Sequence, residues 1–147
     1  MAYVQIVLNG PDAIIEEAPA SGTISPGHLI EEQVDGAVEV HAHAGEACLP
    51  LIALEQIVDG KGVDTDYVSG DTVRYAVARR GEEYALILTT YQDAVVGSDL
   101  ESNGDGTVRV AGMDSSWGAV KIQSIVGKAR EAVTTADEVG YVRTRIW

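Results

Sequence analysis

Short stretches of alternating apolar and polar residues, separated by glycine turns, constrain this chain more than any other feature of its sequence. Alternation with a period of two is typical of strands that bury one face. Asn-Gly and Asp-Gly pairs supply the positive φ angles that tight hairpins need. Glycine turns occur at Asp35-Gly36, Asp59-Gly60, Ser69-Gly70, Arg80-Gly81, Asn103-Gly104 and Asp105-Gly106. This pattern predicts a mostly β chain, folded as a small β-barrel or a sandwich.

The body of the chain is expected to form a series of short strands. They are predicted at 29–33, 37–42, 49–56, 72–78, 83–89, 99–102, 107–111, 119–126 and 141–146. Two segments leave a helix open. In 119–133, Gly127 favours a strand, a kink and a second strand, and in 46–57, Pro50 favours irregular or edge structure.

The first twenty residues are predicted to be an N-terminal arm, and residues 21–147 a β domain. Residues 3–8 and 13–17 alternate like strands, with a break at Asn9-Gly10-Pro11-Asp12. Residues 18–27 carry two prolines and few large apolar side chains, so a loop is expected there. Two interpretations stay open: the arm adds a strand to a neighbouring subunit, or it forms an edge strand of its own domain.

Charge and apolar content exclude several classes of partner. Asp and Glu number 23 against 10 Lys and Arg, giving a net charge of −13, and such a surface repels nucleic-acid phosphates. The longest apolar run, Ala47 to Leu54, is too short to span a bilayer. We therefore expect neither nucleic acid nor a membrane as partner, and no signal peptide at the N-terminus. Cys48 is alone and lies in an apolar stretch, which predicts a buried structural thiol.

His41, His43 and Glu46 form the strongest candidate for reactive chemistry. On a strand, residues two apart point to the same face, so the two imidazoles and the carboxylate could ligate a metal ion. The alternative is a pair of histidines on an exposed strand face. The sequence contains no Gly-x-Ser-x-Gly frame and no phosphate-binding loop. We therefore expect no catalysis and no cofactor, and keep the metal site as the alternative.

Contact with other subunits is expected from aromatic and apolar residues near the two ends of the chain. Trp117 follows a small polar loop, and Trp147 follows the predicted last strand. Aromatic side chains are enriched at interface centres. The β-branched N-terminal segment is suited to strand addition. The predicted contact residues for a capsid or a subunit are Tyr3, Val4, Ile6, Leu8, Trp117 and Trp147.

Residues 28–147 resemble the small decoration (cement) proteins of tailed-virus capsids. The likeness rests on 68–75 (Val-Ser-Gly-Asp-Thr-Val-Arg-Tyr), on 96–108, and on Ile125 to Val133 followed by Val142-Arg143-Thr144-Arg145-Ile146. The resemblance implies a barrel or tulip fold and a homotrimer that binds the major capsid protein. It also implies attachment to the outer surface of the virion, where the protein stabilises the head, and no enzymatic activity. The alternative function is a carbohydrate-binding or host-adhesion β module of a viral appendage.

Overall fold

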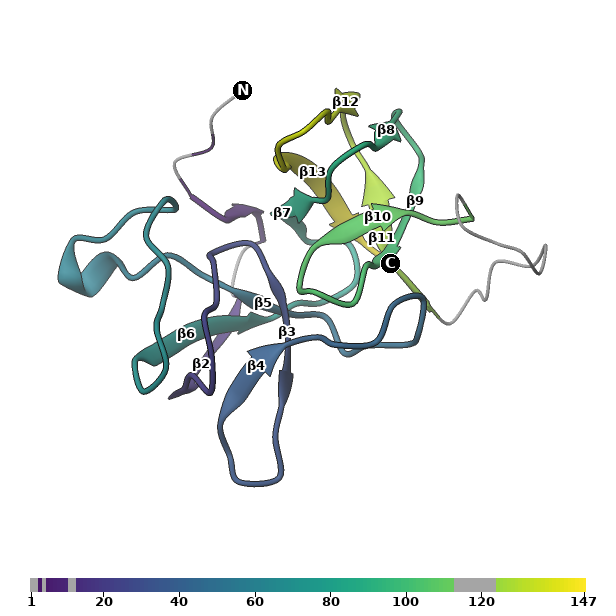
Figure 1. Cartoon of the computed structure of the whole chain (residues 1–147). Coiled ribbons are helices and arrows are strands. Elements are labelled where there is room, and N and C mark those ends of the chain that lie inside the picture. The colour runs from purple at the N-terminus through teal and green to yellow at the C-terminus, as the bar shows by residue number, and fades with distance from the viewer. Residues whose placement is uncertain (1–2, 4, 11–12, 113–123) are drawn as a thin grey trace.

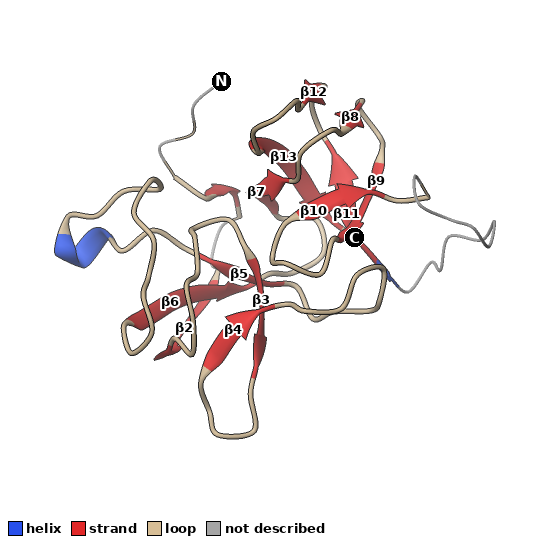
Figure 2. Ribbon diagram, in the orientation of Figure 1, coloured by secondary structure: helices blue, strands red, loops and turns tan. Residues whose placement is uncertain are grey.

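A computed structural model of the chain describes residues 3, 5–10, 13–112 and 124–147. Their secondary structure is almost entirely β, with one short 3₁₀ helix, η1 (Ile57–Asp59) (Figures 1 and 2). The strands are β1 (Val7–Asn9), β2 (Ile14–Pro19), β3 (Leu29–Glu32), β4 (Val38–Val40), β5 (Leu51–Ala53), β6 (Thr72–Val77), β7 (Glu83–Leu88), β8 (Asp93–Ala94), β9 (Asp99–Ser102), β10 (Val108–Val110), β11 (Ile125–Ala129), β12 (Val133–Thr134) and β13 (Gly140–Ile146). The predicted mostly β fold class is confirmed.

Five strands close into a barrel. Their order is β7-β10-β9-β11-β13, and β13 pairs back onto β7 over six residues, from Gly140 opposite Leu88 to Arg145 opposite Glu83. Closure leaves these strands without a free edge over the paired length. Inward-facing residues alternate along β13, where Val142, Thr144 and Ile146 are buried. The barrel lies in the upper right of Figure 1.

The other half of the molecule is a five-stranded antiparallel sheet in the order β2-β6-β5-β3-β4. A parallel bridge between Ala20 and Val38 links the chain after β2 to β4, at the opposite edge. The sheet has its own small apolar cluster, which includes Ile24, Val38 and Tyr67. One isolated bridge thus connects the two edges of this sheet, whereas β13 closes the barrel onto β7 with a ladder of six residue pairs.

The two halves share one apolar core. Leu29, Ile52 and Leu54 of the five-stranded half pack with the barrel interior in a single buried cluster. Backbone hydrogen bonds also cross between the halves, since the Leu29 N–H donates to the Gly106 carbonyl at 2.7 Å and the Ile87 N–H to the Gly27 carbonyl at 3.2 Å. All six residues of β7 are buried, because one face lines the barrel and the other is covered. β7 is thus packed between the barrel interior on one face and the five-stranded half on the other.

Most predicted strands are present, with shorter bounds. The loop predicted over 18–27 begins two residues later than expected, because β2 runs to Pro19, and within it Ile24 is fully buried. The predicted strand 119–126 falls largely outside the described residues. β11 continues through Gly127, so the predicted second strand does not begin there, although the strand is irregular at this point. The residues after β11 bend without forming a helix.

Close packing explains why glycine occupies position 127 without ending the strand. A Cβ atom added there would lie 2.4 Å from the Arg145 carbonyl oxygen and 2.7 Å from the Thr144 Cγ2. Real side chains do not approach so closely, so β11 reaches its place beside β13 because residue 127 has no side chain. The register of β11 against β9 also shifts between Ile125 and Gly127, which is typical of a bulge.

The N-terminal residues lie along both halves of the molecule. In β1, Val7 pairs with Tyr84 of β7, and all six residues of β2 pair with β6. The predicted boundary between arm and domain at residue 20 stays a prediction. None of the helical segments in the described part of the chain has the length and apolarity needed to cross a bilayer.

Candidate interaction surface

Outward-facing arginines on the last strand define the most distinctive surface of the molecule. Because β13 alternates, Arg143 and Arg145 are exposed on the outer face of the barrel while their neighbours are buried. In the β7–β13 ladder, Arg145 lies directly opposite Glu83. The strand register therefore brings together side chains that are sixty residues apart in the sequence.

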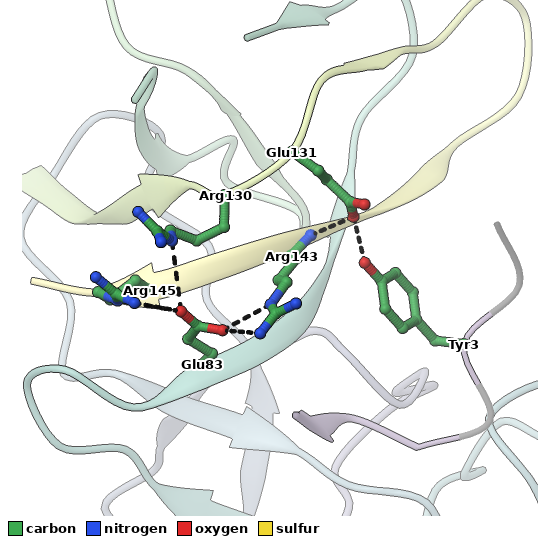
Figure 3. A network of polar contacts seen from close by, with 6 residues as sticks. All are labelled: Tyr3, Glu83, Arg130, Glu131, Arg143 and Arg145. Atoms are coloured by element: carbon green, nitrogen blue, oxygen red, sulfur yellow. Dashed lines mark hydrogen bonds and ion pairs between the residues drawn. The ribbon is translucent and has the colours of Figure 1, made fainter. Parts of the chain in front are cut away.

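Glu83 is the centre of a network of ion pairs (Figure 3). Its side chain is 2% exposed, and three arginines surround it that are each 41–46% exposed. Arg143 Nε donates to Glu83 Oε2 at 2.6 Å, and Arg145 Nη2 donates to Oε1 at 2.7 Å. Arg130 Nε lies 3.4 Å from Oε1. One buried carboxylate is thus shared by three guanidinium groups.

Ionisation of Glu83 is maintained by its partners. Burial on its own raises the pKa of this carboxyl group, but the hydrogen bonds and charges of Arg143 and Arg145 outweigh burial. The net result is a pKa below the ordinary value for glutamate. The cluster is therefore charged at neutral pH, and it ties β13 and the segment after β11 to β7.

Glu131 extends this network to the N-terminal segment. Its carboxylate accepts hydrogen bonds from the Arg143 backbone N–H at 2.8 Å and from the Tyr3 hydroxyl. The Tyr3 ring also meets the Tyr141 ring edge-on, with 6.3 Å between centroids. Burial and the hydrogen bond to Glu131 raise the pKa of the Tyr3 hydroxyl, so it stays protonated and donates. These contacts hold the start of the chain against the barrel.

Trp147 lies at the other end of the same face, beside a pocket of about 280 Å³. Its ring is 54% exposed and is flanked by two cations, with Arg80 Cζ 5.1 Å and Lys128 Nζ 5.2 Å from the ring centroid. Val96 and Ile146 supply apolar lining. Arg130 and Arg145 also line the pocket, so it adjoins the Glu83 cluster directly.

This face carries an excess of positive charge on an acidic protein. The face holds four acidic residues, Glu82, Glu83, Asp99 and Glu131, and six basic residues, which are named below. The chain as a whole has a net charge of −13. Six of its ten basic residues nevertheless gather around these contacts: Arg79, Arg80, Lys128, Arg130, Arg143 and Arg145.

The predicted contact residues have different environments. Trp147 is exposed, whereas Ile6 is fully buried, with its N–H donating to Glu55 Oε2 and its carbonyl accepting from Ala85. Leu8 and Tyr3 are partly buried against the main core. Val4 and Trp117 lie outside the described residues. In the structure of the single chain, the described N-terminal contact residues therefore pack on their own barrel.

His41 and His43 are adjacent, with ring centroids 5.9 Å apart. His41 is buried, and its Nδ1 is 2.7 Å from Ser102 Oγ, whereas His43 and Glu46 are exposed. Burial lowers the pKa of His41 more than the nearby Glu31 raises it. Within the described part of the chain, no group of three or more His, Cys, Asp or Glu side chains is arranged to hold a metal ion. The His41 ring contacts Glu31 of β3 at 3.8 Å and Ser102 of β9, so it links the five-stranded half to the barrel.

Sequence reasoning missed the Glu83 cluster and the cations beside Trp147. The alternation of Arg143 and Arg145 was a usable signal, since it placed both on one face of the last strand. Glu83, the carboxylate that both arginines contact, could not be recognised in the same way, because a glutamate inside an apolar strand gives no indication of partners sixty residues away. Arg80 and Lys128 meet Trp147 only through the closure of the barrel.

No family model matches this chain, and no curated protein matches it. Among solved structures, the chain is similar to the crystal structure of the head fiber gp8.5 N base of bacteriophage phi29. The TM-score is 0.59 at 17% sequence identity, over 92% of this chain and 95% of that one. The fold resembles that of a phage head fiber base. At this identity the likeness concerns the fold, and it extends over nearly the whole of both chains.

Proposed function

We propose that this chain is a structural protein of a phage head, attached to the outer surface of the capsid. The observation that carries the proposal is the similarity in fold to the phi29 head fiber base, which extends over 92% of this chain. The sequence resemblance to capsid decoration proteins points to the same location from different evidence. In this proposal the chain binds the major capsid protein and contributes to the stability of the head.

A homotrimer is the assembly we propose. Repeated attachment to a symmetric head favours an oligomer, because several modest contacts made together multiply the affinity. A cyclic trimer uses two different patches on each copy.

The proposal includes no catalytic role. Burial raises the pKa of the Cys48 thiol to about 11, so at neutral pH the side chain is a protonated thiol and a poor nucleophile. Burial lowers the pKa of both His28 and His41, and each of these two rings has a hydrogen-bond partner: Ser25 for His28 and Ser102 for His41. In these environments the Cys48 thiol and the imidazoles of His28 and His41 are suited to a structural role.

Co-sedimentation with purified heads tests the attachment. The purified chain is mixed with heads of the virus that encodes it, pelleted, and quantified against free protein; saturable binding at a fixed number of copies per head is expected. Light scattering on the free chain should give three times the 15.5 kDa monomer mass. Absence of saturable binding to heads would overturn the attachment, and a monomer both free and bound would overturn the trimer.

A further inference from the structure

The pocket beside Trp147 has the features of a binding site for a negatively charged segment. Trp147 is 54% exposed, and two cations flank its ring, at 5.1 Å for Arg80 Cζ and 5.2 Å for Lys128 Nζ from the ring centroid. Exposed aromatic and arginine side chains together dominate the energetics of protein interfaces. The arrangement therefore offers apolar contact area and charge at one place.

Arg80 distinguishes this pocket from the neighbouring Glu83 cluster. Arg130, Arg143 and Arg145 share a buried carboxylate, and Lys128 Nζ lies 2.6 Å from Asp99 Oδ1. Among the described residues, Arg80 has no acidic partner, and its recorded contact is with the Trp147 ring. A guanidinium group with free donors is suited to bidentate pairing with a carboxylate.

The negative charge on the rest of the surface restricts which kind of partner can bind this pocket. Because the chain carries a net charge of −13, an acidic partner is repelled by most of its surface and attracted at this face. Long polyphosphate chains are disfavoured, since their phosphates outside the pocket meet the acidic remainder. A short acidic segment of another protein is attracted to this face and is too short to reach the acidic remainder of the surface.

We propose that this pocket binds an acidic peptide segment of a partner protein. An apolar side chain of the segment packs on Trp147 beside Val96. Carboxylates on either side of it pair with Arg80 and with the remaining donors of the Lys128 ammonium group, which also contacts Asp99. The pocket, at about 280 Å³, accommodates one such side chain and its neighbours. This inference goes beyond the proposed function, because it holds for the isolated protein whatever assembly the chain joins.

Fluorescence anisotropy with a labelled peptide tests the proposal. The probe is a fluorescein-labelled peptide of sequence Glu-Glu-Leu-Glu-Glu, and its matched control carries Gln in place of every Glu. Saturable binding is expected for the acidic probe at low salt, at least about tenfold tighter than for the Gln peptide. Raising the ionic strength should weaken it, because exposed charges are screened.

Variants separate this pocket from general charge effects. The double variant R80A/K128A should lose at least about tenfold in affinity, and W147A about fivefold. K61A removes one cation from the loop after η1, which does not line this pocket, and should change affinity less than twofold. Thermal melts of each variant check that the fold is intact.

Several results would overturn the proposal. Equal binding of the Gln peptide, or equal loss in K61A and R80A/K128A, would remove the role of these cations. Tighter binding of short-chain polyphosphate than of the peptide would assign the pocket to phosphate. Self-association that R80A/K128A abolishes, with no peptide binding, would assign it to a second copy of the chain. None of these results bears on attachment to heads, which is measured separately.

Discussion

The Glu83 cluster and the Trp147 pocket are neighbouring regions that use the same kinds of side chain in different ways. Arg145 contributes to both. At Glu83, three arginines converge on a carboxylate that is 2% exposed, so their charges are already committed within the fold. At Trp147, the flanking cations face an exposed ring, and Arg80 has no acidic partner among the described residues. The position of the acid decides whether an arginine stabilises the fold or is available to a ligand.

Replacing Glu83 should have the largest effect of any change in this comparison. E83Q leaves three guanidinium groups around a neutral amide, and removing one partner of a buried ion pair costs about 3 kcal/mol in unfolding free energy. Urea denaturation measures the loss. The matched control E138Q changes an exposed residue of the loop before β13 and should shift stability by less than about 0.5 kcal/mol. A loss below about 1 kcal/mol for E83Q would contradict the structural role of the cluster.

Replacing Gly127 tests the close packing of β11 against β13, the two strands that carry Lys128 and Arg145. G127A should cost about 2 kcal/mol, because the added methyl group clashes with the Arg145 carbonyl oxygen and either β11 or β13 must shift. G62A is the control, since nothing lies within 4 Å of its new Cβ atom. Urea unfolding of the two variants gives the comparison. If G127A is as stable as the unchanged chain, the tight contact of β11 with β13 is wrong.

Acid should weaken the Glu83 cluster before it affects the pocket. The pKa of Glu83 is lowered in the folded state, so its contribution to stability is fully present above the ordinary glutamate pKa of 4.5. It is lost as pH falls from there through the lowered value, because the unfolded chain then binds the proton more readily. Unfolding free energy measured from pH 7 to pH 3 should fall less steeply in E83Q. Identical slopes would show that Glu83 is not held ionised by its arginines.

Trp147 should show the smallest effect on stability. W147A removes a half-exposed ring and two cation–π contacts, each worth about 0.5–1 kcal/mol at exposed sites, so a total loss near 1 kcal/mol is expected. Chemical denaturation checks this value, with W147F as the conservative comparison. A loss above about 3 kcal/mol would mean that Trp147 is part of the core and that its exposure has no functional meaning.

Much of the fold could be predicted from local patterns. The strand at 99–102 has the predicted bounds, and β13 begins one residue earlier than expected. The segments after the predicted turns at Gly70 and Gly104 each place a buried valine, Val73 or Val108, within the first two residues of a strand. Alternation and glycine turns act within a few residues, which is why these features can be recognised without a structure.

Long-range features could not be predicted. β8 and β12 are two residues long, too short for any periodicity to register. Gly127 was interpreted as a kink because its packing partner, the Arg145 carbonyl group, lies on another strand. Glu83 was not singled out, since a glutamate is rarely buried and its three arginines come from distant parts of the chain. Of the contact residues, Ile6 was predicted from its apolar character, but the same character buries it in the core.

Localisation of the chain on virus particles tests the central claim most directly. If the proposed function holds, the chain is carried on virus particles; these are labelled with antibody and gold and imaged by electron microscopy, with particles lacking the protein as the control. The proposed function predicts label distributed over the outer surface of the head. Label confined to the tail, or absent from intact particles that contain the protein, would contradict it.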